Sequence, residues 1–231
     1  MNPSVTVSID GAIIDAPKGS SVLDAALSAG ICIPHLCRVP YIESIGACRI
    51  CIVEHIENGW PKVTTSCTLL VKEGMVISSN SEKIRKMRKN IAELLVTEAP
   101  NSRAIQDVAA RCGVEDVRYP FRNNDCVLCG RCVVACTGRF GEKAIGFIGR
   151  GDDRRVESPF NLYSELCNEC GRCRDLCPMT VAPCDGPMHD GEERLCGNCE
   201  AKIFTPEAEQ GACISCYLGE GFQCERAEFS L

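Results

Sequence analysis

The segment CVLCGRCVVAC (residues 126–136) is followed by a second, similar segment, CNECGRCRDLCP (residues 167–178). Both have the spacing Cys-x2-Cys-x2-Cys-x3-Cys, which binds cubane iron–sulfur clusters. A gap of two residues lets consecutive thiolates of one tight loop point at one cluster, while the helix that follows carries the fourth Cys to the other cluster. The pattern predicts one 4Fe–4S cluster on Cys126, Cys129, Cys132 and Cys177, and another on Cys167, Cys170, Cys173 and Cys136.

A disulfide-rich secreted domain is the alternative explanation of so many cysteines. The segment MNPSVTVSID at the start has no basic region followed by an apolar one, as a secretion signal would. No apolar run approaches the ~18 residues that span a bilayer. Thiols committed to metals are typical of a reducing compartment. We therefore expect a cytoplasmic electron-transfer protein with no direct membrane insertion.

The composition limits both the fold and the partners. Twenty of the 231 residues are Cys, whereas only 5% are aromatic, which favours metal clusters in place of one large hydrophobic core. The net charge of −6 argues against a nucleic-acid partner. The one basic run, residues 83–89, is interpreted as the solvated face of a helix or a docking patch for an acidic subunit.

The N-terminal segment has the pattern of a hairpin followed by a helix. Val5, Val7 and Ile9 alternate with polar residues before Asp10-Gly11, and residues 12–15 return as a second strand. Ser20 or Ser21 can cap a short helix that ends at Gly30. This order, followed by a long Cys-bearing loop, is typical of a β-grasp ferredoxin.

The loop supplies a third set of cysteines, with a pattern close to that of plant-type 2Fe–2S proteins. The plant pattern is Cys-x4-Cys-x2-Cys with a distant fourth Cys. Here the first gap is ten residues, and the set is Cys37, Cys48, Cys51 and Cys67. Gly46 and Ala47 are small enough for the loop amides to approach the cluster sulfurs. Cys32 is interpreted as a small buried residue rather than a ligand.

The motifs PHLC (34–37), GACRICIVE (46–54) and TSC (65–67), with the two later runs, resemble a known family. They are similar to the N-terminal part of the large iron–sulfur subunit of respiratory complex I. The diaphorase-type iron–sulfur subunits of NAD-linked hydrogenases and formate dehydrogenases share this arrangement. In that family the helical region holds a further 4Fe–4S cluster on one His and three Cys. Residues 81–120 contain no His and only Cys112, so that cluster is predicted to be absent.

Two helices are expected between the cluster domains. Apolar residues recur at helical spacing before Pro100, and the stripe is interpreted as packing: Ile84, Met87, Ile91, Leu94 and Leu95. Asn101 or Ser102 then begins a second helix, with Cys112 as a buried helix residue and Gly113 as its end. Further on, residues 144–149 and 154–157 are expected to pair as strands.

The C-terminal segment adds six more cysteines. Cys196, Cys199, Cys213 and Cys216 have zinc-ribbon-like spacing and are predicted to bind one metal. A third 4Fe–4S cluster drawing on Cys184 or Cys224 is the alternative to zinc. A metal would order a polar, Gly-rich segment that has little core of its own.

The predicted fold class is α+β with four parts. Residues 1–80 form a β-grasp 2Fe–2S ferredoxin domain, and residues 81–120 form a short helical linker that lacks the family's His/Cys cluster. Residues 121–180 form a two-cluster 4Fe–4S ferredoxin domain, and residues 181–231 form a Cys-rich metal-binding tail.

No catalytic residue is predicted, because the chain has neither a Gly-x-Gly-x-x-Gly nor a Walker motif nor a catalytic triad. The predicted function is to relay single electrons between a flavoprotein subunit that oxidises NAD(P)H and the catalytic subunit of a soluble oxidoreductase complex. That complex is expected to be a hydrogenase, a formate dehydrogenase or a similar enzyme, electron-bifurcating ones included. The alternatives are the iron–sulfur subunit of a succinate dehydrogenase or fumarate reductase, and a redox sensor or assembly scaffold.

Overall fold

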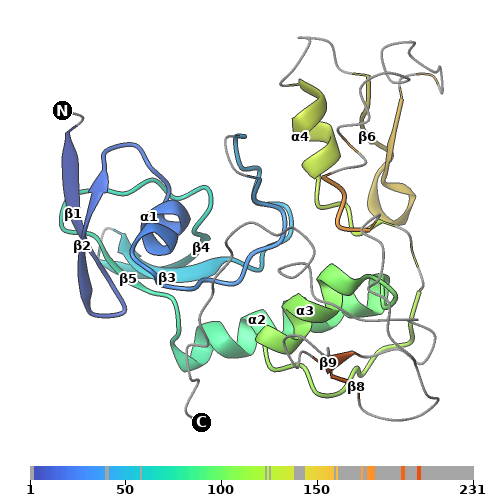
Figure 1. The fold of residues 1–231 in the computed structure, drawn as a ribbon, viewed down its shortest axis with the longest axis horizontal. Helices are drawn as coiled ribbons and strands as arrows, with labels where there is room; N and C mark the ends of the chain where they lie inside the picture. The colour runs from blue at the N-terminus through green and yellow to red at the C-terminus, as the bar shows by residue number, and fades with distance from the viewer. Residues whose placement is uncertain are drawn as a thin grey trace.

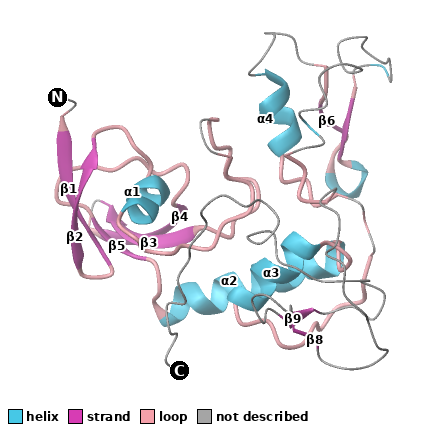
Figure 2. Cartoon of the chain, in the orientation of Figure 1, coloured by secondary structure: helices cyan, strands magenta, loops and turns pink. Residues whose placement is uncertain are grey.

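The fold is given by a computed structural model (Figure 1). It describes residues 3–39, 42–57, 59–122, 124, 126–137, 144–158, 160, 173 and 176–179, with only the backbone of 57, 137, 194–195 and 202–203. A five-stranded sheet and one helix form the N-terminal unit, a pair of helices follows, and a short helix and small hairpin lie beyond them (Figure 2). Within the described residues, no helix is both long enough and apolar enough to cross a bilayer.

The first two strands form the predicted hairpin. β1 (Ser4–Ile9) pairs antiparallel with β2 (Ala12–Pro17). Asp10 and Gly11 both have positive φ values, 51° and 87°, as a two-residue type I′ turn requires. The Asp-Gly pair therefore produces the turn expected of it.

The other three strands make the sheet a mixed one, with the order β2-β1-β5-β3-β4. β5 (Val76–Ser78) runs parallel to β1 and antiparallel to β3 (Ile52–Glu57). β4 (Trp60–Thr65) pairs antiparallel with β3 at the edge. The loop from α1 to β3 and the segment after β4 carry the first set of cysteines, so the sheet positions both ends of that set.

One helix, α1 (Val22–Ser28), covers a face of this sheet (Figure 1). Its N-cap is Ser21, whose Oγ accepts a hydrogen bond from the Asp24 N–H at 3.0 Å, so the expected cap is resolved to Ser21 rather than Ser20. The helix and sheet bury a hydrophobic cluster that we call the sheet core. Its members include Val7, Ile9, Val22, Leu23, Cys51, Val53, Cys67 and Ile77.

The helical pair consists of α2 (Glu82–Glu98) and α3 (Arg103–Arg111), which pack against each other (Figure 1). Both expected helices are present, and Ser102 is the N-cap of α3. Cys112 caps the C-terminus of α3 and is half-buried rather than buried, since it lies one residue beyond the last turn.

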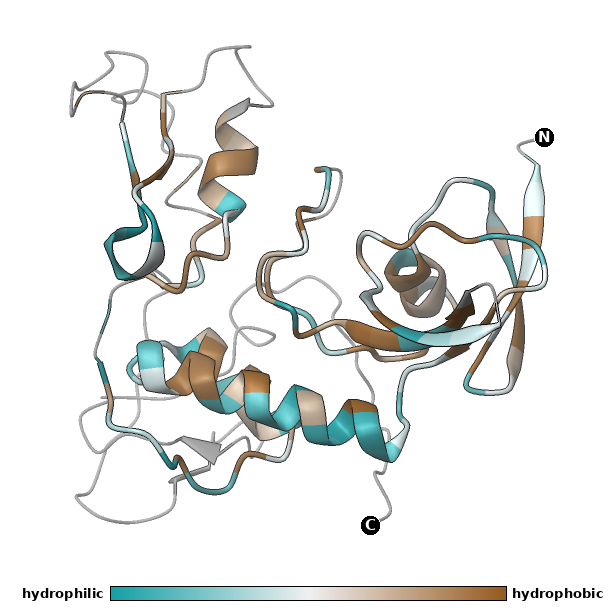
Figure 3. Cartoon of the chain, turned by 180° about the vertical axis from the view of Figure 1, so that it is seen from behind, coloured by the Kyte–Doolittle hydropathy of each residue, from teal (hydrophilic) through white to brown (hydrophobic). Residues whose placement is uncertain are grey.

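The buried face of α2 differs from the predicted stripe. Ile84 is fully buried, but Met87 and Leu94 are 38% and 52% exposed, so they do not serve as packing residues. The buried face follows the i, i+4 row instead and packs against α3 and the ligand loop, whereas hydrophilic residues alternate with hydrophobic ones along the helix (Figure 3). That row is Ile84, Arg88, Ala92 and Val96.

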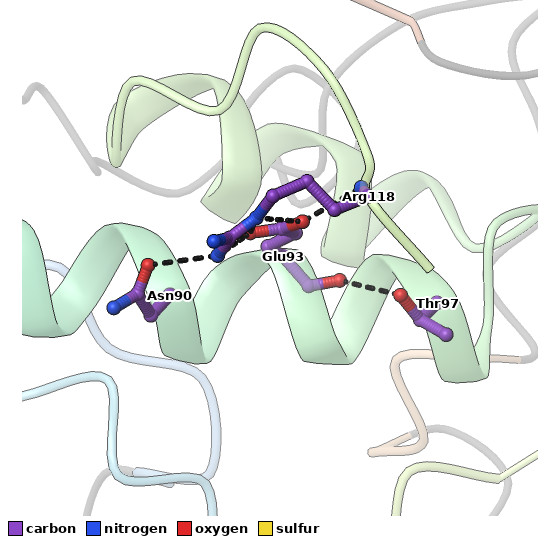
Figure 4. A network of polar contacts seen from close by, with 4 residues as sticks. All are labelled: Asn90, Glu93, Thr97 and Arg118. Carbon is purple, nitrogen blue, oxygen red and sulfur yellow. Dashed lines mark hydrogen bonds and ion pairs between the residues drawn. The ribbon is translucent and has the colours of Figure 1, made fainter. Parts of the chain in front are cut away.

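Glu93 is, besides Arg88, a second buried charged residue on α2, and its carboxylate is neutralised by a residue that the structure describes. Glu93 accepts hydrogen bonds from the Arg118 N–H at 2.7 Å and from the Arg118 guanidinium at 2.6–3.0 Å (Figure 4). Arg118 also donates to Asn90 Oδ1 at 3.1 Å. These bonds fasten the segment after α3 to α2, and this segment leads toward the first cubane-type run.

The second cysteine-rich unit contains α4 (Arg131–Thr137) and a hairpin of β6 (Gly146–Ile148) and β7 (Arg155–Glu157). The two strands pair antiparallel within the predicted ranges. A further two-stranded pair, β8 (Arg194–Leu195) and β9 (Lys202–Ile203), has β9 beside α3.

A second hydrophobic cluster, which we call the junction core, joins the loop, both long helices and the later unit. It includes Leu36, Cys37, Cys48, Ile50, Val96, Ile105, Val108, Val114 and Cys129. Cysteines of two predicted cluster sites therefore share one buried core.

Candidate metal centres

The predicted 2Fe–2S ligands come from three places around the sheet. Cys37 and Cys48 lie on the loop between α1 and β3, Cys51 directly precedes β3, and Cys67 follows β4. All four are buried, with exposed fractions of 5%, 6%, 1% and 5%, respectively. Cys37 and Cys48 belong to the junction core, whereas Cys51 and Cys67 belong to the sheet core. The site lies where the two cores meet.

The four sulfurs approach one another in pairs. Cys37 and Cys48 are within hydrogen-bond range, as are Cys51 and Cys67, and Cys37 also reaches Cys67. Hydrogen bonds from neighbouring thiols lower the pKa of Cys37 to about 2 and that of Cys51 to about 7. The same bonds raise the pKa values of Cys48 and Cys67. Four sulfurs this close cannot all be thiolates unless a cation lies among them.

The loop amides point at these sulfurs, as the small residues predicted. The Cys37 sulfur accepts hydrogen bonds from the backbone N–H groups of Cys48 and Ala47, which also lower its pKa. Gly46 has φ +62°, and a Cβ there would lie 3.0 Å from Thr65 Oγ1. A side chain at this position would be strained and would collide with the segment that carries Cys67. Gly46 therefore lets the two halves of the site close together.

The donor set fits a binuclear cluster better than a single ion. Among the described residues, no group of three or more His, Cys, Asp or Glu side chains is arranged to hold one metal ion. Four buried sulfurs in two neighbouring pairs would suit a 2Fe–2S cluster, which would supply one-electron chemistry at this site. Cys32 is half-buried and disulfide-bonded, so it does not join this set, and the expectation that it is simply buried was wrong.

Arg88 is the functional neighbour that sequence reasoning missed. It was expected on a solvated basic face, but it is only 6% exposed, unlike Lys83, Arg85, Lys86 and Lys89 around it. Burial lowers the pKa of its guanidinium, and the nearby charges of Cys112, Cys51 and Asp10 oppose that effect. The i, i+4 relation of Arg88 to Ile84 and Ala92 was the available signal.

The first cubane-type site gathers three cysteines of one run and one of the other. Cys129 and Cys132 lie near enough to Cys126 and Cys177 for the charges on those thiols to raise their pKa values. Burial is the larger cause, and it raises the pKa of Cys132 to about 11. Cys177 thus lies beside the first run, although it follows Cys136, the last cysteine of that run, by 41 positions in the sequence.

The second cubane-type site is only partly within the described residues. Cys136 lies on α4, where its sulfur accepts a hydrogen bond from the Ala144 N–H at 3.3 Å, and Cys173 is exposed. Cys167 and Cys170 lie outside the described residues. The same holds for every cysteine of the predicted tail site: Cys184, Cys196, Cys199, Cys213, Cys216 and Cys224.

The loops of the first two sites touch. Gly130 has φ +76°, and a Cβ on it would overlap Ile45 Cδ1 and lie 3.1 Å from the Phe147 ring. Arg131, the next residue, directs its guanidinium at the carbonyls of Arg38 and Leu176, each 3.5 Å away. Arg38 follows Cys37, and Leu176 precedes Cys177, so Arg131 lies between ligands of two different sites.

Comparison with known proteins agrees with this arrangement. Residues 2–82 match the family of 2Fe-2S iron-sulfur cluster binding domains, and residues 125–181 match the 4Fe-4S dicluster domains. The chain is therefore an iron–sulfur protein in which a 2Fe–2S ferredoxin-type domain precedes a 4Fe–4S dicluster domain.

The curated relatives of this chain are named as subunits of oxidoreductases. The chain is 31% identical over 203 residues to the NADPH-Fe(3+) oxidoreductase subunit alpha of Geobacter sulfurreducens, covering 75% of this chain and 23% of that protein. It is 28% identical over 204 residues to the mitochondrial NADH-ubiquinone oxidoreductase 78 kDa subunit of Candida albicans, covering 76% and 28%. The chain thus spans less than a third of either relative.

A solved structure has the same fold over most of its length. It is a crystal structure of an NAD+-reducing NiFe hydrogenase in the H2-reduced state, with a TM-score of 0.65 and 28% identity. The match covers 76% of this chain and 85% of that one. The predicted resemblance to the large iron–sulfur subunit of complex I and to subunits of NAD-linked hydrogenases is confirmed.

Proposed function

We propose that this chain relays single electrons between a flavoprotein that oxidises NAD(P)H and the catalytic subunit of an oxidoreductase complex, such as a hydrogenase. The observation that carries the proposal is the direct contact between the loops of two cluster sites, at Ile45 and Gly130. Adjacent one-electron centres are what a relay needs. Further support comes from the relatives, whose names describe NAD(P)H-linked enzymes.

The proposed ligands follow the three cysteine sets. Cys37, Cys48, Cys51 and Cys67 hold a 2Fe–2S cluster, and Cys126, Cys129, Cys132 and Cys177 hold a 4Fe–4S cluster. A second 4Fe–4S cluster is assigned to Cys136, Cys167, Cys170 and Cys173. When bound, these clusters supply reversible one-electron chemistry, which divides a hydride's two electrons into single steps.

The protein's own residues hold the thiolates, exclude water and direct amides at sulfur. The first site is almost fully enclosed, whereas Cys126 of the second is exposed. An enclosed centre protects the electron from oxidants in solution, and an exposed edge lets an electron pass to a partner surface. We propose that the catalytic subunit or a further carrier docks near the second, more open unit.

The reduction experiment tests the relay. Dithionite should bleach the visible absorbance of the anaerobically reconstituted chain, whereas NADH and NADPH should not. Adding the flavoprotein that copurifies with the native complex should restore bleaching by the pyridine nucleotide. Bleaching of the flavin-free chain by NADH or NADPH alone would contradict the proposal, because it would require a nucleotide site on this chain.

For the tail we propose a zinc ion on Cys196, Cys199, Cys213 and Cys216, with a third 4Fe–4S cluster drawing on Cys184 or Cys224 as the alternative. Paired Cys-x2-Cys knuckles suit tetrahedral zinc. Zinc and iron should be counted in the full chain and in a truncation after Val181. Loss of one zinc supports the proposal, and loss of about four irons with no zinc supports the cluster instead.

A further inference from the structure

A buried cation holds the loop of the proposed 2Fe–2S site. Arg88 extends from α2, and its side chain donates three hydrogen bonds to backbone carbonyls. Nε donates to Ile50 at 3.0 Å, and Nη2 donates to Ile52 at 2.8 Å and to Ser79 at 3.0 Å. Ile50 and Ile52 are the two neighbours of Cys51. One guanidinium therefore fixes the backbone on both sides of a ligand.

The third acceptor connects the loop to the sheet. Ser79 follows β5, and its N–H and hydroxyl both donate to the Asp10 carboxylate in the β1–β2 turn. Arg88 thus joins the ligand loop, the end of β5 and helix α2 at a single point. The rigid fork of an arginine makes several directed bonds at once, which a lysine cannot reproduce.

The positive charge of Arg88 has no direct counter-ion in the described part of the chain. All three of its acceptors are neutral carbonyls, and none of the ion pairs found there includes it. The Asp10 carboxylate is occupied by Ser79. A buried charge without a partner is costly, so such a residue indicates that negative charge is bound nearby.

A bound 2Fe–2S cluster provides that charge. Four thiolates and two sulfides outweigh the charge of two ferric ions, so the oxidised site is anionic, and each added electron makes it more so. Net charge and hydrogen bonding around a cluster set its reduction potential. A fixed cation beside Cys51 favours the reduced state over the oxidised one.

We propose that Arg88 is a positioning residue of the 2Fe–2S site, which fixes the backbone on both sides of Cys51 and raises the reduction potential through its charge. The inference rests on the proposed function, specifically on the ligands Cys37, Cys48, Cys51 and Cys67. Reduction by dithionite adds one electron to the site. It forms and breaks no covalent bond, and Arg88 keeps its proton throughout.

The test compares three variants of the full, anaerobically reconstituted chain. Arg88→Gln removes the charge and most of the fork, and Arg88→Lys keeps only the charge. Arg85→Gln is the matched control, because Arg85 is an exposed arginine on the same helix that donates to a single carbonyl, that of Asn80, at 2.9 Å. The midpoint potential of the 2Fe–2S centre is measured by redox titration followed by EPR.

We expect a more negative midpoint potential in Arg88→Gln and an unchanged one in Arg85→Gln. Arg88→Lys should stay close to the wild-type potential but hold less iron at this site, since it loses the fork. The 4Fe–4S signals in the same samples report whether the rest of the chain is folded. Equal potentials in Arg88→Gln and Arg85→Gln would overturn the proposal, because a purely structural role moves occupancy and not potential.

If Arg88→Gln retains no 2Fe–2S signal, the midpoint potential of Arg88→Lys tests the proposal instead. A lysine variant with a signal at the wild-type potential supports the charge role, and one with a shifted potential or no signal overturns it. Failure of the proposed ligand assignment is a different result. In that case the wild-type chain itself would show no 2Fe–2S signal.

Discussion

The two ferredoxin-type units of this chain differ in what holds their cysteines. The proposed 2Fe–2S ligands are all at most 6% exposed and extend from loops fixed by a five-stranded sheet, α1 and α2. In the second unit, Cys129 is buried, but Cys126 is exposed, and Cys132 and Cys177 are half-buried. Among the residues of this unit that the structure describes, the scaffold is a helix of seven residues and two strands of three.

This difference indicates how each site is formed. The first unit has a hydrophobic core built from sheet and helix residues, so we expect ordinary packing to bring its sulfurs together. The second unit is short, and in such small units a bound metal contributes directly to folding. We therefore expect the fold to prepare the first site and bound clusters to complete the second.

Removing the clusters should produce the largest difference between the two units. After iron is chelated under reducing conditions, residues 4–78 should keep slow hydrogen exchange at the sheet amides, while residues 126–158 should lose protection. Hydrogen-exchange mass spectrometry of the apo and reconstituted chains measures this. Equal loss of protection in both units would contradict the comparison, since the sheet would then also depend on its metal.

Exchange of ligands between the two runs gives the next largest effect. Cys177→Ser should damage the cluster on Cys126, Cys129 and Cys132, because Cys177 lies beside them. Cys136→Ser should instead damage the cluster on Cys167, Cys170 and Cys173. Each variant should lose up to about four irons per chain, with different EPR signals remaining. Loss of the cluster on Cys126, Cys129 and Cys132 in Cys136→Ser, with the other cluster intact, would show instead that each run is self-contained.

The contact between the units can be tested at Gly130. Gly130→Ala and the control Gly113→Ala both place a side chain at positive φ, +76° and +71°, which costs about 1–2 kcal/mol. A Cβ at Gly113 meets nothing within 4 Å, whereas one at Gly130 meets Ile45 and Phe147. We expect Gly130→Ala to cost about 1 kcal/mol more than the control in calorimetry of the loaded chain, since Ile45 must move aside. Equal costs would argue against contact between the units.

The smallest expected effect concerns the Glu93–Arg118 pair, which joins α2 to the segment after α3. Hydrogen bonds from Arg118 lower the pKa of Glu93 in the folded chain. The contribution of Glu93 to the free energy of unfolding is therefore present above the unfolded pKa of about 4.3. It is lost as the pH falls through the lower pKa of the folded chain. Glu93→Gln should lower the Tm by a few degrees at pH 7 and by less near pH 4. A Tm difference that does not change with pH would contradict the assigned charge.

Local signals explain what the sequence predicted correctly. Asp10-Gly11 requires a tight turn, Ser21 can cap only a helix that begins at Val22, and the spacing of the cysteine runs follows from cluster geometry. Local signals could not show that Arg88 is buried or that Met87 is exposed. Their environment depends on which face of α2 meets the ligand loop, and a basic run gives no sign that one of its members is buried.

The sequence also could not predict which cysteine sulfurs of the first site lie next to each other. The plant-type pattern gives four ligands, but the ten-residue first gap leaves the path of the loop open. The positive φ at Gly46 and Arg49 and the close approach of Gly46 to Thr65 determine that path, and these depend on contacts across the sheet.

Cluster content tests the central claim most directly. Iron and acid-labile sulfide should be measured per chain in anaerobically reconstituted protein, with the tail contribution subtracted by means of the truncation after Val181, and EPR spectra recorded after dithionite reduction. We predict about ten irons, one 2Fe–2S signal and two interacting 4Fe–4S signals. About six irons or fewer in fully loaded protein, or the absence of a 2Fe–2S signal, would contradict this account.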